Sequence, residues 1–382
     1  MAKQITLSEN IRRYRKAQGL TQAELAERLH VSFQAVSGWE TGTTVPDILN
    51  LMHLTEVLNV SADALLAPRD TGKQYLIGID GGGSKTEFAL FSTDGTVLLH
   101  FVLSATNPDT DGLESACGVL RQGVEKCLAK DVPVCGIFAG IAGSYQDRIA
   151  AFFERRFPKI PFFIDSDAVN ILAGYDSDIG FICGTGSIVI VRQNGENHFL
   201  GGWGATLGDP GSAYNVGREA IRAALFMEEE TGERTLIRPL LCEKIGIAPE
   251  KRLMDRLDDI SVWGVTYIAS LSTTVTSAAK ESDAVALAIL DREYALLMKE
   301  VNTAHKRFRC GNTVMMGGGM IGHNRELLLP ILQKYAAPEM RLTASDLPPI
   351  YGAAVECCRR LGIDLPDGFH ERFRETYQTN NH

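Results

Sequence analysis

Two apolar runs in this chain each end in a glycine-rich turn and continue at once as a second apolar run. The first pair spans residues 75–92 with the turn GGGSKT, and the second spans 179–192 with the turn GTGS. Runs of this length predict strands, and turns this short predict that each pair forms a hairpin. Because glycine lets a backbone approach a ligand closely, two such hairpins could hold one polyphosphate from opposite sides.

Asp80 ends the first strand, beside amides that the following glycines expose. A carboxylate in this position suits Mg²⁺ together with phosphate oxygens. The turn is not a Walker loop, because Ser84 interrupts the Gly-Lys-Thr sequence and because a strand, rather than a helix, follows it. Taken alone, the motif is equally compatible with a tight hairpin that binds nothing.

A third glycine turn, MMGGGM at 315–320, follows another apolar run. Residues 317–322 formally fit GxGxxG, the pattern of dinucleotide-binding folds. We find no clear βαβ unit with an acid at the end of its second strand, so we do not expect such a fold.

The pattern of the chain changes near residue 67. Residues 1–66 are helical in periodicity, 67–74 (APRDTGKQ) form a polar linker, and 75–382 alternate strands, glycine turns and helices. With 382 residues, the chain is also longer than one hydrophobic core usually serves. We therefore expect a helical head joined to a larger α/β region.

Capping residues divide the head into short helices. Thr21 with Glu24 forms a capping box, and Ser32 begins a helix over 33–40 that Gly42 ends. Two further helices are expected at 47–58 and 62–66. The buried side of the second helix is predicted to consist of Ala23, Leu25, Ala26 and Leu29.

The segment TQAELAERLHVSFQAVSGWETG at 21–42 resembles the helix-turn-helix of Cro/repressor-type (XRE family) regulators, and the match covers 7–66. The resemblance implies operator DNA as partner, a helix in the major groove, and an internal ion pair between Arg15 and Glu40. Gln34 suits bidentate bonding to adenine, and Phe33 could touch thymine methyl groups. The implied DNA contacts are Gln22, Ser32, Phe33, Gln34, Ser37 and Gly38. The alternative is a helical bundle that binds protein.

Charge separates the two regions. The whole chain carries a net charge of −9, but residues 1–66 hold six basic and seven acidic groups, so most of the acidity lies after the linker. A head of charge −1 gains little from phosphate neutralisation. We therefore expect a homodimer on two half-sites about 34 Å apart.

The three glycine turns, in this order, resemble those of the actin/hexokinase/Hsp70 superfamily. Within it the chain is similar to the N-acetylglucosamine kinase branch, which shares a family with BadF/BadG/BcrA/BcrD ATPases. The most specific motif is GGWGATLGDPGSAY at 201–214, although Pro210 stands where the family commonly has an acid. The other motifs are DGGGSKT (80–86), ATNPDTDG (105–112), DSDAVN (165–170), CGTGS (183–187), MMGGGM (315–320) and PPIYGAA (348–354).

This resemblance, over about 75–360, implies a two-lobed α/β actin-like (ribonuclease H-like) fold around an interdomain cleft, behind the all-α head. Lobe I would comprise about 75–177 plus a C-terminal helix at about 348–363, and lobe II about 178–347. It also implies ATP and Mg²⁺ as cofactors and an amino sugar as substrate.

The resemblance gives each matched residue a role. Asp80 would hold Mg²⁺, and Asp167 would act as the general base that takes the proton from the attacking sugar hydroxyl. The ATP-binding residues would be Gly82, Gly83, Ser84, Lys85, Thr185 and Gly186 at the phosphates and Gly317, Gly318 and Gly319 at the adenosine. The sugar-binding residues would be Asn107, Asp167, Gly202, Trp203, Gly204 and Asp209.

Structural alternatives stand beside these roles. Asp167 could be the N-cap of a helix, Asp209 could belong to a β-turn that binds nothing, and Trp203 could be a core residue. Glu87 and Asp165 are interpreted as structural.

Cysteine usage and hydropathy bear on location. Eight cysteines without a CxxC motif favour buried, reduced thiols and a cytoplasmic protein. The most apolar stretch, 132–142, is too short to span a bilayer, so we expect no membrane association. The tail at 364–382 is polar, and we expect its end to be frayed.

The sequence therefore predicts an ATP-dependent amino-sugar kinase joined to a DNA-binding head, acting as a sugar-responsive transcriptional regulator. The alternatives are a catalytically inactive sugar sensor and a BadF-type activator ATPase.

Overall fold

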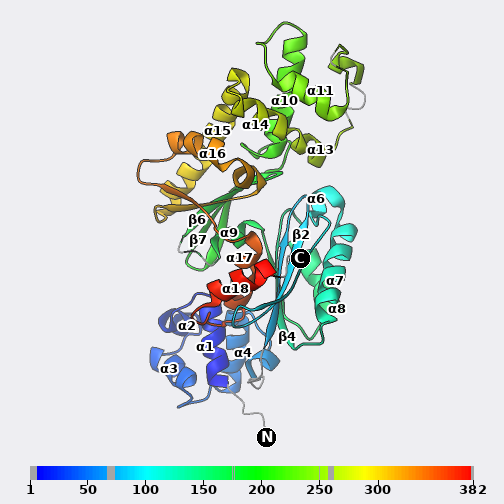
Figure 1. Cartoon of the computed structure of the whole chain (residues 1–382). Helices are drawn as coiled ribbons and strands as arrows, with labels where there is room; N and C mark the ends of the chain where they lie inside the picture. The colour runs from blue at the N-terminus through cyan, green and yellow to red at the C-terminus, as the bar shows by residue number, and fades with distance from the viewer. Residues whose placement is uncertain are drawn as a thin grey trace. The chain divides into compact units, whose positions relative to one another are not determined.

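The chain divides into two compact units in the computed structural model, which describes residues 7–66, 74–173, 175, 177–248, 250–256 and 262–379. Unit 1 comprises Met1–Gly174, Asn194–Glu196 and Ile350–His382, and unit 2 comprises Tyr175–Gln193 and Asn197–Pro349. We call 7–66 the head, the rest of unit 1 lobe I, and unit 2 lobe II (Figure 1). Apart from Gln74, the predicted linker lies outside the described residues.

The head is a helical bundle around its own core. Ile11, Leu25 and Leu54 are among its fully buried side chains. The predicted capping box of Thr21 and the cap by Ser32 are confirmed. The helices are α1 (Leu7–Ala17), α2 (Gln22–Arg28), α3 (Phe33–Thr41), α4 (Ile48–Leu58) and α5 (Ala62–Leu66).

One prediction for the core of the head is wrong. Leu25, Ala26 and Leu29 of the second helix's predicted face are buried, but Ala23 is exposed. Ala23 lies in the first turn of α2, where it borders a surface hollow rather than the neighbouring helices. A small apolar residue near a helix end is weak evidence for burial.

Lobe I is built on a five-stranded sheet of order β3-β2-β1-β4-β5. The predicted hairpin is confirmed, since β1 and β2 are antiparallel and Gly81 faces Thr86 at the turn. Strand β1 is parallel to β4, and β4 is parallel to β5. The strands are β1 (Tyr75–Gly81), β2 (Thr86–Ser92), β3 (Val97–Leu103), β4 (Val134–Ile141) and β5 (Phe162–Asp165).

The helices of lobe I come from both ends of its sequence. Helix α17 packs on β1, because a Cβ on Gly78 would lie 3.2 Å from the backbone nitrogen of Ala354. The helices are α6 (Pro108–Asp111), α7 (Leu113–Leu128), α8 (Gln146–Arg156), α9 (Ala168–Leu172), α17 (Pro349–Arg360) and α18 (Phe369–Thr379).

The polar tail contains a helix that the sequence analysis did not predict. Phe369 and Phe373 of α18 are buried and pack edge-on against Phe91 of β2, and both rings also contact Tyr351. These aromatic residues recur every four positions, the spacing of one helix face. The expectation of a frayed end concerns 380–382, which lie outside the described residues.

Lobe II contains the second five-stranded sheet, of order β10-β9-β6-β7-β8. The second predicted hairpin is confirmed, since β6 and β7 are antiparallel and Cys183 faces Ser187. Its strands are β6 (Ile179–Cys183), β7 (Ser187–Gln193), β8 (Glu196–Gly201), β9 (Thr313–Gly317) and β10 (Arg341–Ala344). Its helices are α10 (Ala213–Glu228), α11 (Ile237–Ile245), η1 (Leu253–Arg256), α13 (Val265–Ser270), α14 (Ser272–Lys280), α15 (Ala284–Phe308) and α16 (Gly319–Tyr335).

A βαβ unit does follow the third glycine turn, although its second strand ends at Ala344 and not at the acid of a dinucleotide-binding fold. Strand β9 leads into α16, and β10 then pairs with β9 in parallel. The unit escaped notice because β10 has only four residues and alternates between exposed and half-buried positions.

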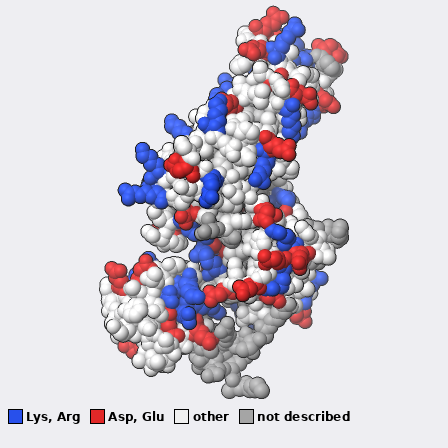
Figure 2. Space-filling model, turned by 60° about the vertical axis from the view of Figure 1, so that its left-hand side comes forward, with Lys and Arg blue, Asp and Glu red and all other residues white. Residues whose placement is uncertain are grey.

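Two surface properties complete the description. None of the described helices combines the length and the apolar character that crossing a bilayer requires. Lys/Arg and Asp/Glu side chains are interspersed over the face shown in Figure 2. Charge alone therefore does not mark a nucleic-acid interface on this face.

Candidate functional site

Two carboxylates of lobe I belong to one row across three parallel strands. Asp80 on β1 faces Gly140 on β4, which in turn faces Asp165 on β5. All three residues lie near the carboxyl ends of their strands, the edge at which α/β sheets bind ligands. Asp167 follows two residues after Asp165, so the sheet brings both predicted catalytic acids to this edge.

Asn170 fixes the carboxylate of Asp80. Its side-chain nitrogen donates a 2.6 Å hydrogen bond to Asp80 Oδ1, and Asn170 is fully buried. Glycine makes room for this amide, because a Cβ on Gly140 would lie 2.4 Å from Asn170 Oδ1. Asn170 belongs to the DSDAVN motif, but no role was predicted for it.

Burial raises the pKa of both acids. Burial raises the pKa of Asp80 to about 7, opposed by the Asn170 hydrogen bond and increased by the charge of Asp167. Within the described residues, no ion pair neutralises Asp80. A recessed carboxylate without a cationic partner is a suitable ligand for Mg²⁺, so the residues present fit the metal that the sequence analysis implies.

Asp167 is free of the capping role that was its structural alternative. It precedes α9 but makes no side-chain capping bond, and Ser166 Oγ accepts the hydrogen bond from the Ala168 N–H instead. Burial raises the pKa of Asp167 to about 6, against the lowering effect of the hydrogen bond that the Ser166 hydroxyl donates to it. A carboxyl group with this pKa can accept a proton near neutral pH.

Only part of the first glycine turn is open to a bound phosphate, because one of its residues is engaged in an ion pair. Gly82 and Gly83 are half-buried and Ser84 is exposed, as phosphate contacts require. Lys85 forms an ion pair with Glu87, whose structural interpretation this contact supports. Burial alone would raise the pKa of Glu87, but the His100 ring 3.6 Å away and the hydrogen-bonded Lys85 ammonium outweigh it and lower the pKa to about 2.

Asn107 and Asp165 both form contacts within lobe I that support the fold. Asn107 caps α6 by accepting a hydrogen bond from the backbone N–H of Asp109, which leaves its side-chain nitrogen for other contacts. Asp165 is ion-paired with Arg360 at 2.7 Å, in agreement with its structural interpretation.

In lobe II, the second hairpin turn is braced by the first residues of α10, which directly follow the DPGS segment. The backbone N–H groups of Ala213 and Tyr214 donate to the carbonyl oxygens of Gly184 and Thr185. Asp209 is buried, and its Oδ1 accepts a 3.1 Å hydrogen bond from the N–H of Gly204. The β-turn that begins at Asp209 is therefore bonded to the glycine-rich 201–204 segment.

Asp209 itself belongs to a real β-turn. Its carbonyl oxygen accepts a hydrogen bond from the N–H of Ser212, and its φ of 59° places it in the left-handed region that aspartate tolerates. Burial raises its pKa, opposed by backbone N–H groups of Gly204 and Ser187. The β-turn and the implied sugar contact do not exclude each other.

Trp203 is not a core residue. Its side chain is 74% exposed, and Gly202 and Gly204 on either side of it are exposed too. The exposed indole ring is therefore available to a ligand, and its glycine neighbours add no side chains that would cover it. Exposure at this position agrees with the sugar contact that the resemblance implies.

Glu300 on α15 is a candidate that the sequence analysis missed. Its Oε2 is buried without a hydrogen-bond partner among the described residues, and a Cβ on Gly201 would lie 2.5 Å from it. Burial and the charge of Asp209 raise its pKa. The isolated glutamate carries no sequence signal, and only the packing of α15 brings it to this loop.

The third glycine turn lies beside the second one within lobe II. Strands β6 and β9 are parallel neighbours, and a Cβ on Gly318 would lie 2.3 Å from the carbonyl oxygen of Cys183. Gly317 and Gly319 are at the end of β9 and the start of α16. The two turns thus share the carboxyl edge of the sheet, where phosphate and nucleotide groups commonly bind.

Helix α3 and its N-cap Ser32 carry five of the six predicted DNA contacts. Phe33 is 49% exposed, Ser32 and Gln34 are exposed, and Ser37 is half-buried. Gly38 is also half-buried, and it has a packing role, since a Cβ there would lie 2.5 Å from Thr44 Oγ1.

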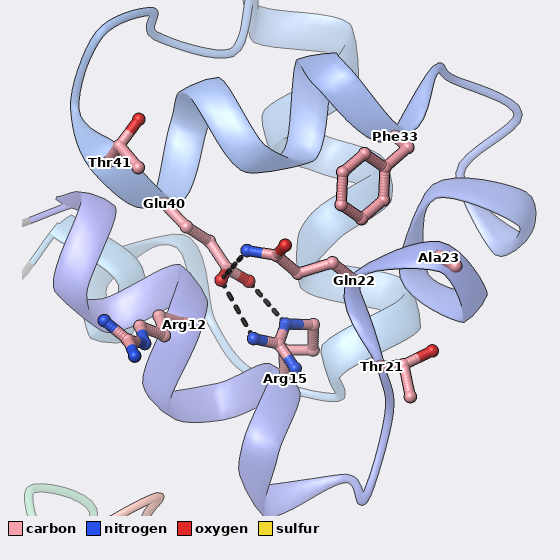
Figure 3. Close-up of a pocket in the computed structure, with 8 residues that line it drawn as sticks. All are labelled: Arg12, Arg15, Thr21, Gln22, Ala23, Phe33, Glu40 and Thr41. Atoms are coloured by element: carbon pink, nitrogen blue, oxygen red, sulfur yellow. Dashed lines mark hydrogen bonds and ion pairs between the residues drawn. The ribbon is translucent and has the colours of Figure 1, made fainter.

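The predicted ion pair inside the head is confirmed. Arg15 and Glu40 are both buried, and the guanidinium binds the carboxylate through Nε and Nη2, the latter at 2.9 Å. Gln22 also donates to Glu40 Oε2, at 2.7 Å (Figure 3). This bond orients the Gln22 amide and leaves its oxygen and second hydrogen for a partner.

A hollow of about 600 Å³ beside this ion pair adds a residue that the sequence analysis did not assign. Arg12 lines it together with Gln22 and Phe33, and Arg12 is exposed (Figure 3). A cation next to two predicted DNA contacts suits a phosphate group.

Two family models match the chain. Residues 77–355 match the BadF/BadG/BcrA/BcrD ATPase family, and residues 11–65 match a helix-turn-helix family. An N-acetylmuramic acid/N-acetylglucosamine kinase of Clostridium acetobutylicum is 33% identical over 245 residues, which cover 60% of this chain and 79% of the relative.

Solved structures show the same fold. A proposed N-acetylglucosamine kinase from Chromobacterium violaceum aligns with 74% of this chain and 98% of its own, with 22% identity and a TM-score of 0.59. A ROK family transcriptional regulator, a homolog of the E. coli MLC protein, aligns with 97% of this chain and 99% of its own, with 12% identity and a TM-score of 0.51. The helical head followed by a two-sheet α/β region therefore has the sugar-kinase and ROK fold.

Proposed function

Since this chain belongs to the BadF/BadG/BcrA/BcrD ATPase family and carries a helix-turn-helix domain, we propose that it phosphorylates an amino sugar with ATP and regulates transcription in response to that sugar. The observation that carries the proposal is the pair Asp80 and Asp167, both present at one edge of the lobe I sheet and both without an ion pair to any residue that the structure describes. An amino sugar is favoured because the similar Clostridium protein is a kinase of two of them.

In this reaction Asp167 accepts the proton from a sugar hydroxyl while the hydroxyl oxygen attacks the γ-phosphate of ATP. The phosphoryl group moves to the sugar and ADP leaves. Asp80, oriented by Asn170, would hold Mg²⁺, which would neutralise charge on the phosphate oxygens. The backbone amides of the glycine turns would bind the phosphates, and Trp203 and Asn107 would orient the sugar.

The retained acids favour an active kinase over a sensor that has lost catalysis. A BadF-type activator would need exposed cysteine ligands for an iron–sulfur cluster. Cys183, the cysteine at the second glycine turn, is fully buried, and burial raises the pKa of its thiol to about 12. That environment does not favour a thiolate ligand.

The test is ATP-coupled phosphorylation by the purified full chain. N-acetylglucosamine with MgATP should release ADP and yield a phosphorylated sugar, with N-acetylmuramic acid and glucose as comparison substrates. Stabilisation by the sugar without turnover would instead support the inactive sensor. Neither stabilisation nor turnover with any amino sugar would contradict the proposal.

We expect Trp203→Ala to raise the KM for the sugar by about fivefold, because a lost aromatic contact of this kind is worth about 1 kcal/mol. The KM for ATP should change little. Trp203→Phe, which keeps an aromatic face, is the control and should stay near the wild-type KM. Steady-state kinetics with each substrate varied in turn measure the effect, and an unchanged sugar KM in Trp203→Ala would remove this residue from the sugar site.

For the head, we propose sequence-specific operator binding as a homodimer in the cytoplasm. A dimer is supported by the weak charge of one head and by the exposed apolar residues Ile48, Leu49 and Met52 on α4. Free cysteines, six of them buried, agree with a reducing compartment. Sedimentation of the full chain with and without DNA tests the dimer.

We expect Gln34→Ala to weaken operator binding by about 1–3 kcal/mol and to relax the preference at one base pair, because a bidentate base contact is lost. Gln22→Ala, which removes a predicted phosphate contact, should weaken binding to all sequences alike. Selection from random DNA, followed by affinity measurements on the selected site, separates the two effects. An unchanged base preference in Gln34→Ala would rule out its role as a base reader.

A further inference from the structure

Two arginines at the end of α17 share one buried carboxylate. Glu356 has no exposed surface, and it accepts hydrogen bonds from Arg359 Nη2 at 2.6 Å and Arg360 Nε at 2.8 Å. A carboxylate removed from water is strongly unfavourable without such partners. Because both guanidinium groups meet on this one carboxylate, displacing either one alters the bonding of the other.

One of these arginines reaches the segment that carries the proposed base. Arg360 Nη2 donates to Asp165 Oδ2 at 2.7 Å, two residues before Asp167. Helix α17 touches the other end of the same segment, since a Cβ on Gly352 would lie 1.7 Å from the carbonyl oxygen of Asn170. The helix is thus in contact with both ends of segment 165–170.

The other arginine reaches the DNA-binding head, which belongs to the same compact unit as lobe I. Arg359 Nη1 donates a 3.0 Å hydrogen bond to the carbonyl oxygen of Ala17, the last residue of α1. The turn after α17 adds further contacts. A Cβ on Gly362 would lie 2.0 Å from the carbonyl oxygen of Arg13, and Lys16 Nζ pairs with Asp364 at 3.0 Å.

We propose that Glu356, Arg359 and Arg360 couple segment 165–170 to α1, so that ligands bound at that segment change how the DNA-binding head is held. The three residues act as positioning residues, not as ligand contacts. This inference rests on the proposed function, because it assumes that a sugar and ATP bind at the 165–170 segment.

The physical route is short. A ligand that draws the 165–170 segment towards itself displaces Asp165, and Arg360 follows because the two are ion-paired. Glu356 then keeps its hydrogen bonds to both Arg359 and Arg360 only if Arg359 moves as well. Arg359 then shortens or releases its bond to the end of α1. Coupling of this kind changes an affinity only to the extent that the ligand binds the two arrangements differently, with a usual range of about 5- to 150-fold.

The test is hydrogen exchange of the full chain, followed by mass spectrometry, with and without N-acetylglucosamine plus MgADP. In the wild type, exchange should change both in the 165–170 segment and at the end of α1, residues 13–20. In Arg359→Ala, the change at 165–170 and the kinase turnover should remain, and the change at 13–20 should be lost. Lys16→Ala removes an exposed ion pair of the same interface, and it should keep both changes.

Each other outcome contradicts the coupling. If the ligands change exchange in the wild type at 165–170 but not at 13–20, the coupling is overturned and the proposed function is not. The same holds if the change at 13–20 persists in Arg359→Ala. If no segment responds to the ligands, the proposed function fails and the coupling fails with it. Should Arg359→Ala not fold, Arg359→Lys keeps the charge near Glu356 but not the bond to Ala17, and the same outcomes apply.

Discussion

Replacing Asp167 by asparagine is expected to lower kcat for sugar phosphorylation by about 10²- to 10⁴-fold, the usual contribution of a general base. Asparagine has nearly the same shape and can still bind a sugar hydroxyl, but it cannot accept the proton. The sugar should therefore still stabilise the variant against heat. Turnover is measured by ADP release and binding by thermal shift.

The pH dependence gives a second measure of the same role. Asp167 must be ionised to act as a base, and burial raises its pKa to about 6. The wild-type kcat should therefore fall as pH is lowered through about 6, by up to tenfold per unit, and stay level above it until another group titrates. The residual activity of Asp167→Asn should lack this dependence.

Asp147→Asn is the matched control, because it removes an exposed carboxylate of the same lobe at the start of α8. It should keep the kcat and the pH dependence of the wild type. Undiminished turnover in Asp167→Asn would contradict the assignment of the base. Loss of both turnover and sugar binding would show that Asp167 acts in binding, not in proton transfer.

Replacing Glu40 by alanine is expected to destabilise the head by about 3–5 kcal/mol, because it leaves Arg15 buried without its partner. Gln22 loses its acceptor in the same step. A loss of this size is a large part of the stability of a small domain. Hydrogen exchange of residues 11–41 should rise by at least a hundredfold, and DNA binding should be lost, while sugar phosphorylation remains.

Glu27→Ala is the control for this prediction. Glu27 is an exposed acid on α2, and its removal should change the stability of the head by less than about 0.5 kcal/mol. If Glu40→Ala retained the exchange protection of the wild type, the ion pair would not be what holds α1 to α3.

Local signals were sufficient for most of the head. Thr21 and Ser32 were predicted as helix caps because their side-chain oxygens satisfy N–H groups within three residues, and both caps form. The ion pair of Arg15 and Glu40 required the resemblance, since 25 residues separate the partners. Ala23 was misplaced because hydrophobicity alone does not say which side of a helix end is covered.

In the lobes, the sequence correctly predicted the elements that are fixed by residues close together in the chain. Both glycine-turn hairpins form as expected, because a short turn forces its two strands together. Strand β10 and helix α18 were missed. Their identity depends on partners far along the chain, such as Phe91, which covers Phe369 and Phe373.

By itself, the sequence determined the helices of the head and the two hairpins, because caps and turns are set within a few residues. The family resemblance added Asp80 and Asp167 as candidate acids. Only the tertiary structure decided how those acids are supported. Asn170 meets Asp80 across 90 residues of chain, and the same chain end brings Arg360 to Asp165 and Arg359 to Ala17. Such contacts arise from the packing of whole helices and strands, and burial then makes them strong, since a charge removed from water must be neutralised where it lies.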